Sequence, residues 1–226
     1  MASDPAAPSK ARPCIMLLSI ASEEWFDEMY ARLITALSAR APVVRARTSN
    51  AALTFLHNNH PSAIFATDPG VVEPENGAVL QALKQYVSSG GKLIFGGLFS
   101  SFVPPMEMGA FFRNNFDLPW ESGAYHRTTL QLNFAAIENL PARRQQLAFE
   151  YSQKALHVKN VDLAGAIYLP TRDSRIESCV FPPTPISSSN ETPAAWARVG
   201  QGWVGYIGDV NAEEDTDGVV LAMCGV

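Results

Sequence analysis

The strongest constraint on the fold is an alternation of apolar runs with amphipathic segments across residues 14–97. Four apolar runs have the length and continuity of strands buried on both faces of a parallel sheet: Cys14–Ile20, Pro42–Arg47, Ser62–Asp68 and Lys92–Gly97. The three segments between them carry apolar residues at helical spacing. Strands that alternate with helices pair in parallel through right-handed crossovers. The sequence therefore predicts an α/β domain with a mostly parallel sheet.

The second half of the chain is less regular. It contains short alternating segments typical of strands, a hairpin that turns at Gly200-Gln201-Gly202, and a closing helix in "DTDGVVLAMCGV". A Pro- and Ser-rich loop covers Phe181–Pro193. We predict an antiparallel extension of the sheet here, within a single domain over residues 14–226. Residues 1–13 are rich in Ala, Ser and Pro, and are expected to form a disordered tail.

Composition excludes several classes of partner. The chain has 226 residues, 47% of them hydrophobic, which is typical of a globular protein with a sizeable core. A net charge of -5 argues against nucleic acid, whose phosphates need clustered Lys and Arg. No apolar run is long enough to span a bilayer, so no membrane partner is expected. With no secretory signal in the sequence, a cytoplasmic location is expected, with the nucleus as the alternative.

The three cysteines, Cys14, Cys179 and Cys224, are odd in number and widely separated. Each lies in an apolar run. This pattern predicts buried, reduced thiols and favours neither a disulfide framework nor a zinc site.

Three segments together resemble a known family. "LKQYVSSGGKLIFGG" (Leu83–Gly97) has the pattern of a helix, a Gly-Gly stop and a strand that enters a sharp turn. "ARVGQGWVGYIGDV" (Ala197–Val210) has the pattern of a hairpin that ends in a glycine-led turn, and a final helix follows it. This arrangement resembles the class I glutamine amidotransferase-like superfamily, especially its trehalose-utilisation-type branch, from Cys14 to the C-terminus. The resemblance implies a flavodoxin-like, three-layer α/β sandwich.

The catalytic residues of that superfamily are missing from the matching positions. Its active members place a Cys at the sharp turn and a His-x-Glu after the late strand. The Cys attacks a carbonyl, the His takes its proton, and the Glu orients the His. Here the nucleophile position falls near Leu98, with no thiol beside it, while Asp209 and Asn211 take the His and Glu positions. The resemblance therefore implies the fold and argues against glutamine hydrolysis by the usual triad.

A general rule for open parallel sheets selects candidate ligand-binding residues independently, because ligands bind beyond the carboxyl ends of the strands. We expect the ligand-binding residues to be Ser19, Asp68, Gly97, Arg127 and Asn211. Arg127 can hold a carboxylate or phosphate through two parallel hydrogen bonds. The alternative, favoured by strand alternation, is that Arg127 belongs to an ordinary pair on the sheet surface.

Two serines follow the glycine pair at the turn and raise a catalytic alternative. A hydrolase or lyase would use Ser100 or Ser101 as the nucleophile, His126 as the base and Asp209 to orient that base. The simpler interpretation is that paired glycines only let the strand turn sharply. We favour it because no G-x-S-x-G pattern is present.

Five carboxylates lie between Asp209 and Asp217. They do not match a calcium loop, because Glu214 stands where glycine is needed and Val220 where a carboxylate is needed. From Glu213 onward they fit the start of a helix, whose N-terminus favours negative charge. Asp209 lies closer to the strand end, so a transient Mg²⁺ or a polar ligand stays open there. No resident metal or cofactor is expected.

These observations favour a binding domain that takes an unidentified small molecule or a protein partner at the carboxyl end of its sheet, without glutaminase activity. The hydrolase or lyase described above is one alternative, and a subunit that borrows catalytic residues from a partner is another. The sequence therefore leaves enzymatic activity open. The apolar segment Phe99–Phe112 leaves a homodimer open as well, although ordinary core is the interpretation that we favour.

Overall fold

The computed structural model describes residues 14–141 and 147–226 of the chain. Its main sheet has six strands in the order β10-β11-β4-β3-β1-β2, and every neighbouring pair is parallel except β10 with β11. The strands are β1 (Ile15–Leu18), β2 (Val43–Ala46), β3 (Ala63–Ala66), β4 (Lys92–Phe95), β10 (Ala194–Val199) and β11 (Gly202–Ile207). The predicted parallel sheet with an antiparallel extension is confirmed. The predicted tail, residues 1–13, lies outside the described residues.

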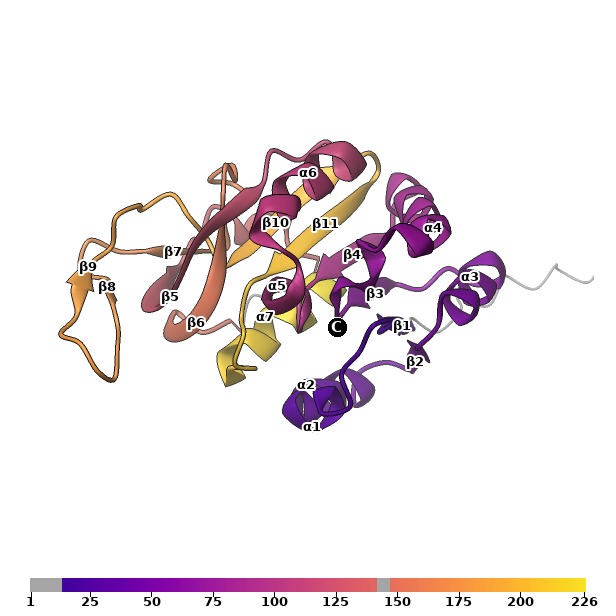
Figure 1. Ribbon diagram of the computed structural model, residues 1–226, viewed down its shortest axis with the longest axis horizontal. Helices are drawn as coiled ribbons and strands as arrows, with labels where there is room; N and C mark the ends of the chain where they lie inside the picture. The colour runs from indigo at the N-terminus through magenta and orange to yellow at the C-terminus, as the bar shows by residue number, and fades with distance from the viewer. Residues whose placement is uncertain (1–13, 142–146) are drawn as a thin grey trace, which may run out of the picture.

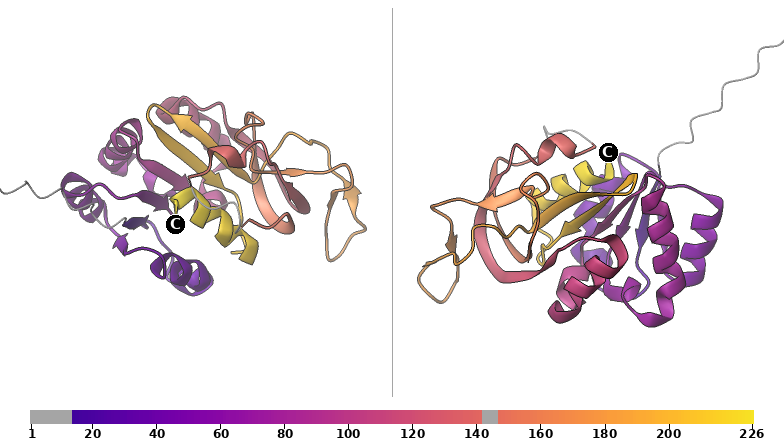
Figure 2. Two further views of the ribbon diagram at one scale, coloured as in Figure 1. Left: turned by 180° about the vertical axis from the view of Figure 1, so that it is seen from behind. Right: turned by 90° about the horizontal axis from the view of Figure 1, so that it is seen from above.

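Helices cover both faces of this sheet, which makes the three layers (Figures 1 and 2). Core residues of α1, α2 and α7 share one apolar cluster, and those of α3, α4, α5 and α6 share the other. The helices are α1 (Phe26–Met29), α2 (Ala31–Ser38), α3 (Ser49–Asn58), α4 (Gly77–Ser88), α5 (Phe99–Phe102), α6 (Pro105–Phe116) and α7 (Glu214–Cys224), with the short η1 (Pro69–Val71), η2 (Pro74–Asn76) and η3 (Ile137–Asn139). Successive strand residues alternate between the two clusters, so the strands are apolar on both faces.

A second sheet, β6-β5-β7, is antiparallel and lies beside the β10–β11 hairpin (Figure 1). Its strands are β5 (Glu121–Leu132), β6 (Glu150–Lys159) and β7 (Tyr168–Pro170). Backbone bonds join it to the main sheet: Leu156 N donates to Gly208 O at 2.9 Å, and Val158 N donates to Thr192 O at 2.8 Å. The carboxyl end of β11 is therefore attached directly to β6.

A pair of short strands, β8 (Arg175–Ile176) and β9 (Thr184–Pro185), forms an arm that projects from the second sheet (Figures 1 and 2). This arm occupies part of the loop that the sequence placed at Phe181–Pro193. The position of the arm explains one error in the prediction that all three cysteine thiols are buried. Cys179 is exposed because its apolar run lies on the arm, whereas Cys14 is half-buried and Cys224 is buried.

The first predicted helix, Glu23–Arg40, is two helices in the structure. The backbone leaves the helical conformation at Tyr30, with φ -100° and ψ 18°, between α1 and α2. The ring of Tyr30 stacks on that of Phe26, with centroids 4.7 Å apart, and both rings are buried. The Phe26 ring lies against Gly97, which follows β4.

The segment Phe99–Phe112 is core only in part. Phe99, Phe111 and Phe112 are buried, whereas Phe102 is 46% exposed and Met106 is 95% exposed. The favoured core interpretation therefore describes the aromatic rings of α6 and the start of α5, but leaves two large apolar side chains on the surface.

Candidate functional site

The turn after β4 is closed by an aromatic ring. Gly97 has a left-handed backbone, with φ +61°. A Cβ at this position would lie 2.9 Å from the Thr67 carbonyl oxygen and 3.1 Å from Phe26 Cε2. In enzymes whose nucleophile stands on a sharp strand-to-helix turn, the nucleophile is the strained residue. That residue is Gly97 here, one position before the predicted Leu98, and the Phe26 ring fills the space where its side chain would point.

The ends of β1 and β3 hold a buried chain of polar side chains. Ser19 Oγ lies 2.7 Å from Thr67 Oγ1, which in turn lies 3.3 Å from Asp68 Oδ2. Asp68 Oδ1 accepts from the backbone amides of Ala21 at 3.1 Å and Gly70 at 3.0 Å. Desolvation raises the pKa of the Asp68 carboxyl, although these hydrogen bonds oppose the rise. The structure thus brings Ser19 and Asp68 together, but both are about 1% exposed and bonded within the protein.

The turn after β11 is organised by Asp209, which is 2% exposed. Asp209 Oδ1 accepts from the Asn211 amide and Oδ2 from the Glu213 amide, each at 2.8 Å. Burial raises the pKa of this carboxyl, while the two amides and the hydroxyl of Thr216 oppose the rise. Both carboxylate oxygens are therefore occupied by the chain that leads into α7.

The first turn of α7 carries Glu214, Asp215 and Asp217, as the helix-start interpretation predicted. Asp217 also pairs with Arg32, with Nε and Oδ2 2.6 Å apart. Burial, and then the charges of Asp209 and Asp217, raise the pKa of the Tyr30 hydroxyl. That hydroxyl is buried and has no hydrogen-bond partner among the described residues.

A partly exposed polar group lies between β5 and the loop before α7. It comprises Arg127, Asn211 and Glu213. The Arg127 guanidinium forms an ion pair with Glu213, and Arg127 Nη1 lies 3.5 Å from Ser152 Oγ. The amide of Asn211, oriented so that both of its ends find partners, accepts from Arg127 Nη2 at 2.8 Å. The side chains of Arg127 and Glu213 are 32% and 25% exposed. This is the accessible polar part of the predicted site.

The groups of the hydrolase alternative are not connected. Ser100 is 4% exposed and its hydroxyl has no hydrogen-bond partner, while Ser101 is exposed. His126 stacks on His157, with ring centroids 4.6 Å apart. Asp209 bonds to backbone amides instead. Across residues 14–141 and 147–226, no hydrogen bond joins either serine, His126 and Asp209 to one another.

The two stacked imidazoles are held in the neutral form. His157 is 1% exposed, and its Nδ1 lies 3.1 Å from the Ala124 carbonyl oxygen. Desolvation, with the charge of the neighbouring His126 ring acting in the same direction, lowers the pKa of His157 to about 4. Desolvation also lowers the pKa of His126, against the opposing charge of Glu191. With both pKa values lowered, neither ring is favoured as an imidazolium at neutral pH, and each keeps a single N–H.

Several residues of this region were not predicted. Thr67 and Thr216 bind the buried carboxyls, Glu213 holds Arg127, and the Phe26 ring lies against Gly97. No sequence signal showed that the first helix would break at Tyr30 or that the Phe26 ring would reach this turn. Glu213 was assigned only to the helix start.

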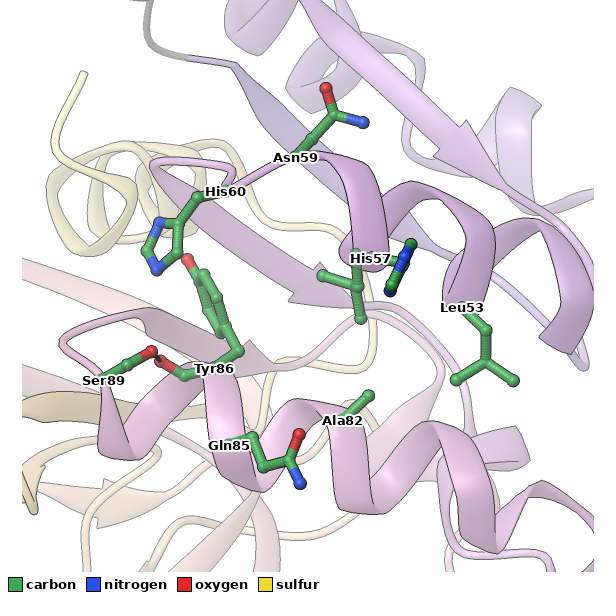
Figure 3. Close-up of a pocket in the computed structure, with 9 residues that line it drawn as sticks. Leu53, His57, Asn59, His60, Ala82, Gln85, Tyr86 and Ser89 are labelled. Atoms are coloured by element: carbon green, nitrogen blue, oxygen red, sulfur yellow. Dashed lines mark hydrogen bonds between the residues drawn. The ribbon is translucent and has the colours of Figure 1, made fainter.

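The surface is hollowed elsewhere. A groove of about 620 Å³ lies between α3 and α4, and Figure 3 shows Leu53 and His57 on one wall with Ala82 and Gln85 on the other. His60 and Ser89 stand just before β3 and β4, so the groove opens at the amino ends of those strands, opposite the predicted site. Its lining side chains include no Asp, Glu, Lys or Arg.

Two features are absent from the described residues: a cluster of metal ligands and a membrane-spanning helix. No group of three or more His, Cys, Asp or Glu side chains in that part of the chain is placed to hold a metal ion. None of the helices in the two described ranges is long and apolar enough to cross a membrane.

Comparison with known proteins gives a fold and no closer kinship. The sequence matches no family model and no curated protein. Among solved structures, a ThuA-like protein from Bacteroides uniformis matches with a TM-score of 0.53 and 12% identity, over 98% of this chain and 94% of that one. A ThuA-like protein from Parabacteroides merdae matches with a TM-score of 0.55 and 11% identity, over 95% and 89%. A β-galactosidase from Bacillus circulans sp. alkalophilus matches with a TM-score of 0.51 and 11% identity, over 93% of this chain but 30% of that enzyme.

The class defined by these observations is an α/β domain with the fold of ThuA-like proteins over nearly its whole described length. This agrees with the trehalose-utilisation-type branch that the sequence resembles. The same fold forms under a third of the matched β-galactosidase chain. At such low identity the likeness is one of fold alone.

Proposed function

We propose that this protein is a non-catalytic, amidotransferase-like domain that binds a small molecule or a protein partner at the carboxyl end of its main sheet and does not hydrolyse glutamine. The observation that carries the proposal is the turn at Gly97. Its left-handed residue has no side chain, and the Phe26 ring occupies the space in front of it. A covalent mechanism needs a nucleophile with a base in reach at this turn, and the neighbouring acid Asp209 is already bonded to two amides.

The binding part of the proposal rests on the polar group Arg127, Asn211 and Glu213. A guanidinium, an amide and a carboxylate lie together there, partly exposed, at the end of the sheet where open α/β folds bind ligands. Ser19 and Asp68 are buried and bonded within the protein, so they would not touch a ligand. A ligand with an acidic group would compete with Glu213 for Arg127.

Ammonia release from glutamine tests the catalytic half. We expect no release above that of heat-inactivated protein, in an assay validated with an active glutaminase. Release that Gly97→Val abolishes would contradict the proposal, because it would place chemistry at the turn that we describe as closed.

Thermal shift tests the binding half. The wild type and Arg127→Gln would be screened against amino acids, sugars, phosphates and dicarboxylates, with Arg113→Gln as the matched control. Arg113 is a surface arginine in a comparable ion pair, with Glu121 at 2.8 Å. We expect at least one compound to raise the Tm of the wild type and the control but not that of Arg127→Gln. A shift retained in Arg127→Gln would place the binding site elsewhere.

The hydrolase or lyase alternative keeps one observation in its favour, the unpartnered hydroxyl of Ser100. A fluorophosphonate probe tests it directly. Labelling at Ser100 or Ser101 that is lost in His126→Ala would replace the binding proposal, whereas the buried position of Ser100 leads us to expect no labelling.

A homodimer and a subunit that borrows catalytic residues from a partner also stay proposals. Phe102 and Met106 supply exposed apolar surface for a contact of either kind. Light scattering on the purified chain separates these proposals. A dimer supports self-association, whereas a monomer leaves the subunit that borrows catalytic residues from a partner.

A further inference from the structure

The β8–β9 arm carries an apolar segment that the body of the protein does not bury. Figures 1 and 2 show the arm projecting from the second sheet. Val180 is 80% exposed and Phe181 is 70% exposed. Residues 182–185, which continue the segment as Pro-Pro-Thr-Pro, are exposed as well. Exposed aromatic and apolar residues grouped on a projecting element mark an interaction site more often than a structural one.

The backbone of this segment, Phe181–Pro185, has little freedom. Proline fixes φ near -65°, and a residue that precedes proline is biased toward extended or polyproline-II conformations. Every position of the segment is a proline or precedes one. It is therefore biased toward a polyproline-II helix, with three residues per turn, which places Pro182 and Pro185 on one edge. A ligand restrained in this way loses little entropy on binding.

The arm presents the segment rather than letting it collapse. Pro185 pairs with Arg175 and Thr184 with Ile176 across the two strands. The arm is tied to β5, because Thr128 Oγ1 donates to Arg175 O at 2.8 Å. The free end is shaped by Ser178, whose Oγ accepts from the amides of Val180 at 3.1 Å and Phe181 at 3.2 Å.

The chemistry of the segment restricts its partner. Glu177 is the single charged residue between Ile176 and Asn190, and its carboxylate is held by the hydroxyls of Thr129 and Ser152, each at 2.8 Å. Recognition therefore rests on the Phe ring and the proline edges. Addition of a strand from a partner is disfavoured, because the prolines lack the N–H groups that a sheet edge needs.

We propose that Phe181–Pro185 is a docking segment for a partner domain whose aromatic-walled groove binds polyproline-II helices, with Phe181 as the anchor. Grooves of this kind occur in the EVH1, WW and SH3 classes of domain. The proposal does not depend on the Gly97 turn or on the Arg127 side chain, although the arm is joined to β5 by the bond from Glu177 N to Arg127 O at 2.9 Å.

Fluorescence anisotropy with the full-length protein tests this proposal. The protein, labelled at its N-terminus, would be titrated with one purified domain each of the EVH1, WW and SH3 classes. We expect saturable binding to at least one domain, weakened about tenfold or more by Phe181→Ala, because burying a Phe side chain contributes that much. The double variant Pro182→Ala/Pro183→Ala should also bind more weakly, because it frees the backbone.

Phe134→Ala is the matched control, since Phe134 is 61% exposed on another part of the surface. It should leave the affinity unchanged. Unchanged circular dichroism spectra would show that all variants fold. Absence of binding to all three domains would overturn the proposal, as would binding that Phe181→Ala leaves intact. A wild-type dimer by light scattering that Phe181→Ala dissociates would also overturn it, in favour of a second copy of this chain as the partner.

Discussion

The turns after β4 and β11 stand side by side, because these strands pair in parallel, yet they are closed in opposite ways. The turn after β4 is closed by apolar packing, with the Phe26 ring against Gly97. The turn after β11 is closed by polar bonds, with Asp209 held by two amides and Gly208 bonded to β6. In a catalytic protein of this architecture these two turns would face each other across a substrate. Here each is filled by its own chain, and the polar surface that stays accessible lies beside them at Arg127.

Gly208→Ala should have the largest effect on stability, because it breaks the polar closure. A Cβ at this position would lie 1.9 Å from the Leu156 carbonyl oxygen, which is backbone and cannot swing aside. The bond between Leu156 N and Gly208 O would be lost, which weakens the attachment of the second sheet to the carboxyl end of β11. We expect unfolding free energy to fall by about 3–5 kcal/mol, measured by urea denaturation.

Gly77→Ala is the control for that substitution. A Cβ at Gly77, the first residue of α4, meets nothing within 4 Å. It should leave stability unchanged or raise it by up to about 1 kcal/mol. Equal losses from both variants would show that the close approach at Gly208 has no energetic weight.

The unfolding free energy should also depend on pH, through His157 on β6, the strand to which the polar turn is bonded. Its pKa is lowered to about 4, against about 6.5 in an unfolded chain. Between these values the unfolded chain binds a proton that the folded protein does not. Acidification from about pH 6.5 to 4 should therefore cost about 3 kcal/mol of unfolding free energy through this one group, at about 1.36 kcal/mol per pKa unit.

Denaturation of the wild type and His157→Asn at several pH values isolates this contribution. The carboxyls of Asp68, Asp209 and Asp217, whose pKa values burial raises, act in the opposite direction but are common to both proteins. The difference between the two proteins should shrink as the pH falls. Parallel curves for His157→Asn and the wild type would refute the prediction.

Gly97→Ala tests the apolar closure. The added Cβ meets both the Thr67 carbonyl and the Phe26 ring, and the left-handed backbone is strained for any residue but glycine. We expect a loss of about 2–3 kcal/mol, smaller than at Gly208 because the Phe26 ring can shift. Combining it with Phe26→Leu should recover part of the loss. A double variant whose loss is the simple sum of the two single losses would show that the ring does not close the turn.

The two halves of the molecule differ in how much of their structure could be predicted from the sequence. Residues 14–97 are governed by local periodicity, so their strands and crossovers could be predicted from apolar spacing alone. The break at Tyr30 could not, because apolar residues continue at helical spacing on both sides of it. The second sheet depends on pairings such as Leu156 with Gly208, which have no local signature. Among the candidate residues, Arg127 and Asn211 meet in space, whereas the burial of Ser19, Asp68 and Asp209 was not visible in their sequence context.

Arg127→Gln should have the smallest effect on stability. This outcome would separate the role of Arg127 from that of the two closed turns. The Arg127–Glu213 pair is partly exposed, and pairs of this kind are screened by water, so its removal should cost no more than about 1 kcal/mol. If the two closed turns supply most of the stability at this end of the sheet, the side chain of Arg127 contributes little to folding and is free to bind a ligand. A loss of several kcal/mol would instead make Arg127 part of the polar closure and weaken the case for a ligand there. A small loss in stability, together with a ligand-induced Tm shift that disappears, would separate binding from folding at one residue.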